Sequence, residues 1–222
     1  MQKKIAVIND LSGYGRCSLT VAIPVLSVMG HQCCPVPTAI LSNHTEFPVY
    51  FFDDYTEKMT AYTDKWKELG LSFDAVATGF LGSEAQIEIV MDMIRKLESE
   101  ETFVVVDPVM GDHGHAYETY TPEMCEQMKE LVCMADIVLP NVTECCILTD
   151  TPYKKENWTR RELLNMAMML RLMGAKSVVI TGVREGSYYT NVVLERGQME
   201  AKFIRTRSSG GERPGTGDVF SS

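Results

Sequence analysis

The feature that most constrains the fold of this chain is the alternation of short apolar segments with longer amphipathic ones. Apolar segments occur at residues 3–9, 73–80, 102–109 and 175–182, and segments with helical spacing lie between them. Strands that are apolar on both faces are typical of a parallel sheet covered on both sides by helices. We therefore expect an α/β fold in which a mostly parallel central sheet is flanked by helices.

The remaining elements are predicted from the same periodicities and from turn residues at their ends. Thr121 and Pro122 form a helix start, and Ser83 opens another helix. No internal repeat or linker is visible, so we expect a single domain over residues 1–222. The expected helices span 16–30, 54–70, 83–99, 121–134 and 159–174, and the other expected strands span 33–40, 135–141, 187–195 and 199–206.

Composition excludes several classes of protein. The net charge of −9 argues against a surface for nucleic acid or another polyanion. No apolar run is long enough for a membrane span, and the start of the chain enters a strand pattern directly, which does not favour a signal peptide. The seven cysteines form no C-x-x-C pair, so we expect reduced thiols in a cytoplasmic protein. The alternative is a zinc site made by His31, Cys33 and Cys34.

A glycine motif follows the first strand and has two interpretations. The residues GYGRCS approximate the dinucleotide fingerprint G-x-G-x-x-G, with Ser18 at the third glycine. A dinucleotide site also needs an acidic residue about 20 positions later, and none occurs between Ser18 and Glu46. We therefore favour a turn in which Gly13 and Gly15 bring the backbone close to a small ligand.

The most specific motif is PGTGDVF near the end of the chain. Two glycines precede the start of a helix pattern, where unpaired N–H groups favour an anion such as a phosphate. A carboxylate at that place repels a bound phosphate, so its presence there suggests that it has a catalytic task. Accepting the proton of an attacking alcohol is such a task, so we interpret Asp218 as a general base rather than as a residue that only complements the helix dipole.

Two other groups of polar residues follow expected strands. Asp107, Asp112, Asn141 and Glu144 could together hold Mg²⁺ against nucleotide phosphates. Equally, Glu144 could cap a helix and Asp107 could simply end a strand. The loop at 43–45 is either a turn or a clamp for a polar substrate, whereas His113 and His115 are expected in a solvated loop.

Seven motifs occur along the chain in this order: SGYGRCS, LSNHTEF, ATGFLGS, DPVMGD, LPNVTE, VVITG and PGTGD. In this order they resemble the motifs of pyridoxal (vitamin B6) kinases of the ribokinase-like superfamily, whose fold is a three-layer α/β sandwich. The resemblance begins near residue 4 and continues to the end of the chain. The related hydroxymethylpyrimidine kinases share DPVM, but they usually have Cys in place of Asp218 and lack SNHT.

The resemblance implies phosphorylation of the 5′-hydroxymethyl group of pyridoxal, pyridoxine or pyridoxamine by ATP and Mg²⁺, with K⁺ as a further candidate cation. A hydroxymethylpyrimidine kinase or a kinase with both substrates is the alternative. Asp218 would be the base, and the N–H groups of Gly215, Thr216 and Gly217 would hold the transferred phosphoryl group. The implied vitamin-binding residues are Ser12, His44, Thr45, Phe80, Asp112 and Asp218. The implied nucleotide-binding residues are Asp107, Tyr120, Leu139, Asn141, Glu144 and Thr181, of which Asp107 and Glu144 would also organise the metal ion.

Two departures from the family pattern qualify this expectation. Phe80 stands where many members carry Tyr, which keeps ring stacking but removes a hydroxyl. The family also continues past the last motif with helices that complete the adenine site, whereas this sequence ends at Ser222. A non-catalytic pyridoxal-binding protein is therefore the alternative from another functional class. The family usually forms homodimers through surfaces near the vitamin site, so a homodimer is expected.

Overall fold

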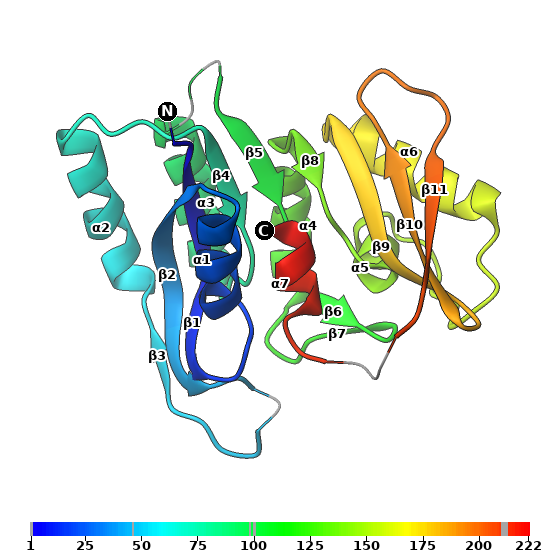
Figure 1. Cartoon of the computed structure of the whole chain (residues 1–222), viewed down its shortest axis with the longest axis horizontal. Coiled ribbons are helices and arrows are strands. Elements are labelled where there is room, and N and C mark those ends of the chain that lie inside the picture. Colours follow the sequence, from blue (N-terminus) through cyan, green and yellow to red (C-terminus); the bar gives the residue numbers. More distant parts are fainter. Residues whose placement is uncertain (1, 46, 98, 100, 210–212) are drawn as a thin grey trace. The chain divides into compact units, whose positions relative to one another are not determined.

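Figure 1 shows the computed structural model of the chain, which describes residues 2–45, 47–97, 99, 101–209 and 213–222. The chain divides into two compact units, and each is described by itself. The first unit comprises Met1–Val105 and Glu212–Ser222, and the second comprises Val106–Gly211.

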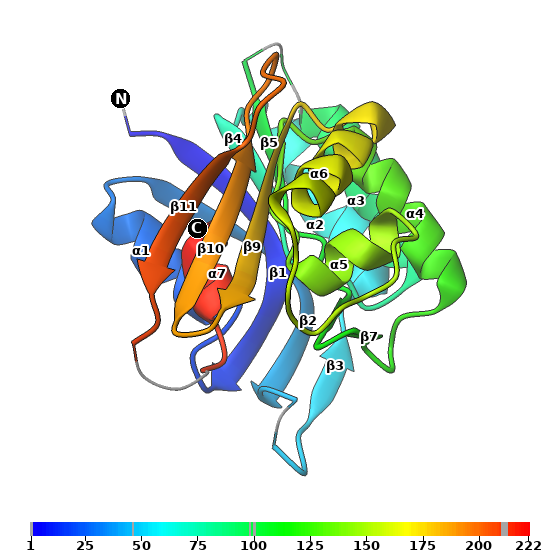
Figure 2. The same cartoon turned by 90° about the vertical axis from the view of Figure 1, so that its right-hand side faces the viewer.

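The first unit is a layer of strands with helices on both faces. Strand β1 pairs in parallel with β2 and with β4, and β3 pairs antiparallel with β2 at the edge of the sheet. Helices α1 and α7 lie on one face, and α2 and α3 lie on the other (Figures 1 and 2). The strands in spatial order are β5 (Phe103–Val106), β4 (Ala75–Thr78), β1 (Lys4–Tyr14), β2 (Gln32–Asn43) and β3 (Phe52–Asp54). The helices are α1 (Leu19–Val28), α2 (Thr56–Glu68), α3 (Glu84–Leu97) and α7 (Thr216–Ser221).

The apolar stretch of β1 explains how this unit is held together. Val7 on β1 forms a buried cluster with Leu19, Ala22 and Leu26 of α1. Burying a side chain of the size of Leu or Val contributes roughly 1.5–3 kcal/mol, so this cluster fixes α1 on the sheet. The helix ends at the expected place, because Gly30 follows with a φ of 85° that most other residues avoid.

The second unit combines a sheet with three helices that lie on one of its faces (Figure 2). Strand β8 pairs in parallel with β9, and β9, β10 and β11 form antiparallel hairpins. The strands are β8 (Ile137–Val138), β9 (Ser177–Glu185), β10 (Tyr188–Leu194) and β11 (Lys202–Arg207), with a separate pair β6 (Gly111–Asp112) and β7 (His115–Ala116). The helices are α4 (Pro122–Cys133), α5 (Val142–Leu148) and α6 (Arg160–Met173).

Most of the predicted elements are confirmed within a few residues. Thr121 caps α4, since its hydroxyl accepts a hydrogen bond from the Met124 N–H at 3.1 Å. The sequence did not predict β3, β6 or β7, and it offered α5 only as an alternative. In the part of the chain that the structure describes, no helix has the length and apolar character needed to cross a membrane.

Candidate active site

The middle of β1 carries Asn9, which is the centre of a buried polar group. The Oδ1 atom of Asn9 accepts hydrogen bonds from the backbone N–H of Asp10 at 3.0 Å and of Phe80 at 2.9 Å. Its Nδ2 atom donates to Oδ1 of Asp218 at 3.3 Å. This side chain therefore joins β1, the loop after β4 and the short helix α7, all within the first unit.

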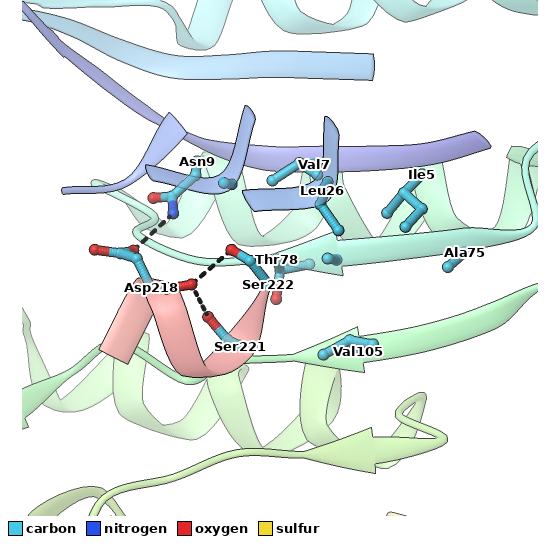
Figure 3. A pocket seen from close by; sticks show the side chains of 12 residues that line it. Ile5, Val7, Asn9, Leu26, Ala75, Thr78, Val105, Asp218, Ser221 and Ser222 are labelled. Carbon is cyan, nitrogen blue, oxygen red and sulfur yellow. Dashed lines mark hydrogen bonds between the residues drawn. The ribbon is translucent and has the colours of Figure 1, made fainter. Parts of the chain in front are cut away.

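Asp218 lies in the first turn of α7 and is half-buried. Figure 3 shows its carboxylate beside Asn9, at one end of a small cavity of about 80 Å³. Its backbone carbonyl accepts hydrogen bonds from the hydroxyls of Ser221 and Ser222. The other cavity-lining residues are mostly apolar: Ile5, Val7, Ala22, Leu26, Ala75, Ala77, Thr78 and Val105.

The two glycines of the GTGD motif differ in whether the fold requires a glycine at their position. Gly215 has a φ of 78°, and a Cβ atom there would lie 2.0 Å from the carbonyl oxygen of Arg16. Only glycine fits this position, because the loop packs directly on the backbone before α1. A Cβ atom on Gly217, by contrast, would meet no atom of the described residues within 4 Å. Packing within the described chain therefore does not require Gly217, whose open side leaves space for a ligand.

Asp10 is a buried carboxyl group next to this loop. The hydroxyl of Ser12 donates to its Oδ2 atom at 2.9 Å. Burial raises the pKa of Asp10, with a further contribution from the charge of Asp218, while hydrogen bonds from Ser18 and Ser12 lower it in part. Ser12 was predicted to contact the vitamin; it is 1% exposed, and its hydroxyl is engaged with Asp10.

The other predicted vitamin-binding residues of this unit lie in two loops, His44 and Thr45 after β2 and Phe80 after β4. The His44 ring packs on Gly15 so closely that a Cβ atom on Gly15 would lie 2.3 Å from His44 Cδ2. The His44 ring also contacts the Phe47 ring, at 4.6 Å between centroids. Among the described residues, Nδ1 of His44 is buried without a hydrogen-bond partner. Thr45 is exposed, and Phe80 is half-buried.

In the second unit, Glu144 is a fully buried carboxyl group at the start of α5. Its two oxygens accept backbone hydrogen bonds, Oε2 from Asn141 at 2.7 Å and Oε1 from Met110 at 3.2 Å. The Asn141 side chain in turn accepts from the Glu144 N–H at 3.0 Å, which completes a capping box. The capping interpretation of Glu144 is therefore confirmed.

The charge around Glu144 is not balanced by these hydrogen bonds. Burial raises the pKa of Glu144 well above its usual range, and the nearby charges of Asp107 and Asp112 raise it further. Oxygen donors of like charge fit a hard cation such as Mg²⁺, which relieves their repulsion. The described residues hold no group of three or more His, Cys, Asp or Glu side chains suited to a metal ion. A metal ion held by Asp107 and Glu144 therefore stays a prediction.

The remaining predicted nucleotide-binding residues lie around the same start of α5. Asn141 donates from Nδ2 to the Gly111 carbonyl at 2.9 Å and forms a β-bridge with Thr181. Leu139 is buried, and its N–H donates to the Val106 carbonyl at 2.9 Å. Tyr120 is buried, its hydroxyl has no hydrogen-bond partner among the described residues, and burial raises its pKa.

The cysteines do not form the alternative zinc site. All seven are free thiols, and no metal-binding group of three occurs among the described residues, so the set of His31, Cys33 and Cys34 is not assembled. Burial raises the pKa of the Cys33 thiol to about 11, which keeps it protonated.

Sequence reasoning missed the role of Asn9. The residue was visible only as a polar residue at the end of the first apolar strand. Its partner Asp218 lies more than 200 positions later, and no spacing rule links two such distant positions. The only available signal was that polar residues at strand ends of an α/β sheet gather where ligands bind.

Comparison with known proteins gives consistent similarities. The family model for phosphomethylpyrimidine kinase matches residues 23–222. A protein from Bacteroides thetaiotaomicron, described as a phosphomethylpyrimidine kinase and crystallised with pyridoxal, is 42% identical with a TM-score of 0.94, over 99% of this chain and 78% of that one. Pyridoxal kinase from Lactobacillus plantarum is 29% identical with a TM-score of 0.89, over 98% of this chain and 77% of that one.

A curated relative shows the same similarity at lower coverage. Pyridoxal kinase of Dictyostelium discoideum is 29% identical over 190 residues, which are 82% of this chain and 61% of that protein. The solved structures confirm the fold class expected from the sequence, an α/β fold with a mostly parallel central sheet flanked by helices.

Proposed function

Since the chain belongs to the phosphomethylpyrimidine kinase family, we propose that it transfers the γ-phosphoryl group of ATP to the 5′-hydroxymethyl group of B6 vitamers. The observation that carries this proposal is the carboxylate of Asp218 beside the open face of Gly217. The pyridoxal bound to the relative that is 42% identical supports a vitamer as the substrate. Residues 1–222 would act as one kinase domain.

In the proposed reaction, Asp218 accepts the proton of the vitamer hydroxyl as its oxygen attacks the γ-phosphorus. The bond from that phosphorus to the bridging oxygen of ATP breaks, and ADP leaves with the electron pair. The N–H groups of Gly215, Thr216 and Gly217 stabilise the charge on the transferred group. Positioning and electrostatic stabilisation supply most of the catalysis in such transfers.

The other predicted residues have proposed roles in binding. Glu144 and Asp107 would hold Mg²⁺, which neutralises charge on the nucleotide phosphates when bound, and K⁺ is a further candidate at this place. The residues proposed to contact the vitamer are Ser12, His44, Thr45, Phe80 and Asp112. The residues proposed to contact the nucleotide, besides the two metal-binding acids, are Tyr120, Leu139, Asn141 and Thr181.

The description of the family model favours one second candidate, a hydroxymethylpyrimidine kinase. The two substrates carry the hydroxymethyl group on different rings, so the same phosphoryl-transfer machinery could serve both. Turnover of the three vitamers and of hydroxymethylpyrimidine, measured side by side with ATP, separates them. A higher kcat/KM for the pyrimidine would contradict our first proposal, and vitamer binding without turnover would indicate the non-catalytic alternative.

The assignment of Asp218 is tested with Asp218→Asn, which keeps the shape of the side chain and removes the base. Turnover should fall by about 10²–10⁴-fold, the usual contribution of general acid–base catalysis. Binding of vitamer and ATP, measured by calorimetry, should be nearly unchanged. The control is Asp64→Asn, because Asp64 is a half-buried residue of α2 whose Oδ1 atom lies 3.7 Å from Nζ of Lys96, outside the proposed site. Near-normal turnover of Asp218→Asn would contradict the role.

We further propose a homodimer in the cytoplasm. Its support is a set of exposed apolar side chains on and beside β3, the outermost strand of the first unit. Exposed apolar patches commonly mark protein–protein contacts, and an edge strand offers unpaired backbone groups as well. We call this set the aromatic patch; its residues are Tyr14, Phe47, Val49, Tyr50, Phe51 and Phe52.

A further inference from the structure

The orientation of the Asn9 amide is fixed by the protein itself. The side chain is buried, and two backbone N–H groups, those of Asp10 and Phe80, donate to its Oδ1 atom. An amide has one acceptor end and one donor end, so this leaves Nδ2 as the end that faces Asp218. Gly79 encloses the amide as well, since a Cβ atom there would lie 2.3 Å from Nδ2.

The contact with Asp218 leaves half of the carboxylate available. Nδ2 of Asn9 donates to Oδ1 at 3.3 Å, while Oδ2 of Asp218 accepts no hydrogen bond from the residues that the structure describes (Figure 3). The distance is long for an N–H···O bond, as is common for catalytic contacts before substrate binds. Oδ2 is thus the atom that can accept a proton from a substrate.

Asp218 needs such an anchor because its own helix is short and its surroundings are acidic. The helix α7 has six residues, too few for stable helix formation by itself. Two titratable groups of other segments interact electrostatically with Asp218, namely Asp10 on β1 and Cys17 just before α1. Ionised Asp10 repels the Asp218 carboxylate, whereas the Asn9 amide attracts it.

We propose that Asn9 is a positioning residue, which holds Oδ1 of Asp218 so that Oδ2 faces the substrate hydroxyl. This inference rests on the proposed function for its catalytic meaning. The hydrogen bond itself is a property of the folded chain and can be tested without substrate.

The main test is Asn9→Asp. Aspartate keeps an acceptor for the N–H groups of Asp10 and Phe80, but it loses the donor and adds a like charge against Asp218. We expect kcat to fall about ten- to hundredfold, the effect of losing a hydrogen bond to a charged group. The KM for pyridoxal should change less than threefold, since the Phe80 backbone stays anchored. The acid limb of the kcat/KM profile should move to higher pH. Asn165→Asp, at an exposed site on α6, is the control for added charge.

A double-mutant cycle decides between positioning and general stability. If Asn9 acts through Asp218, Asn9→Asp should have no further effect on kcat in the Asp218→Asn background. The same factor of loss in both backgrounds would overturn the proposal. Asn9→Leu, which removes the donor without adding charge, serves if Asn9→Asp does not fold, and the cycle has the same two outcomes.

A spectroscopic readout separates this inference from the proposed function. The ¹⁵N signal of the Asn9 side-chain amide should shift as Asp218 titrates, and this shift should be absent in Asp218→Asn. Wild-type protein that shows the shift but phosphorylates no vitamer would contradict the proposed function and leave the contact standing. A signal that does not respond to Asp218 would overturn the inference.

Discussion

At the scale of single residues, Asp10 is a buried carboxyl group whose pKa is subject to opposing effects. Burial and the charge of Asp218 raise its pKa, and this outweighs the hydrogen bonds of Ser18 and Ser12. An acid with a raised pKa in the folded state contributes stability that is complete below its unfolded pKa. That stability is lost as the pH rises through the folded pKa.

Asp10→Asn should therefore change the pH dependence of folding. Asparagine can accept a hydrogen bond from the Ser12 hydroxyl without carrying charge, so the variant should gain stability relative to the wild type as the pH rises above the unfolded pKa of Asp, about 3.9. The measurement is the free energy of unfolding in urea below that pKa and at neutral pH, for both proteins. A difference between the two proteins that is equal at these two pH values would contradict the interpretation.

Gly15 is a second residue for which a neighbouring side chain determines the expected effect of a substitution. Its φ of 109° and the His44 ring both oppose a side chain, so Gly15→Ala should displace the ring. We expect the KM for pyridoxal to rise about five- to tenfold, a loss of roughly 1 kcal/mol or slightly more, with the KM for ATP nearly unchanged. Gly30→Ala is the matched control, since Gly30 has a φ of 85° and no described atom within 4 Å of an added Cβ. Equal KM values for the two variants would refute the role of His44.

At the scale of elements, the short helix α7 and its loop contain two glycines with opposite expected behaviour. Gly215→Ala should destabilise the fold by about 1–2 kcal/mol or more, because a positive φ and the Arg16 carbonyl both oppose it. Gly217→Ala should leave the melting temperature equal or higher, since Ala favours helix by up to about 1 kcal/mol. Its turnover should nevertheless fall about a hundredfold, because the methyl group enters the proposed phosphoryl site.

Thermal melts and steady-state kinetics of both variants check this contrast. Full activity of Gly217→Ala would show that the phosphoryl group does not bind beside this loop. A Gly215→Ala variant as stable as the wild type would instead contradict the packing of the loop on Arg16.

Element positions were largely predictable, and the reasons for the exceptions are physical. Apolar periodicity located the long strands and helices, and Thr121 marked the start of α4. The strand β1 extends to Tyr14, five residues past the apolar stretch, because its polar end pairs with β2 after a register shift. Strand β3 has three residues, all exposed, so no apolar pattern marks it.

The site was predictable only in part. The position of Asp218 in the first turn of a helix after a glycine loop was predicted from a local motif and is confirmed, whereas its catalytic role stays a prediction. The Asn9–Asp218 contact and the packing of His44 on Gly15 depend on tertiary structure, for which one sequence offers no local signal. The sequence left a capping role and a metal-binding role open for Glu144; the hydrogen bonds of the folded chain confirm the capping role, and the metal-binding role stays a prediction.

At the scale of the whole molecule, the aromatic patch predicts association of two copies. Phe51 is 63% exposed, and replacing it with Ser should convert a dimer to a monomer in sedimentation velocity experiments. Leu172→Ser on α6 is the control, because Leu172 is 87% exposed but lies outside the patch. A monomeric wild type, or a dimer that survives Phe51→Ser, would contradict the proposed interface.

The capping box of Glu144 has a consequence for which substitutions at residue 144 can be tolerated during evolution. Aspartate is too short to reach both backbone groups that Glu144 binds, and glutamine offers a single acceptor oxygen for the two N–H donors. Substitutions of Glu144 should therefore be selected against because they destabilise α5, even in a lineage in which catalysis has been lost. A descendant that became a scaffold or a vitamin carrier would keep the acidic residue as a relic, and its survival in a genome would be no record of enzyme activity.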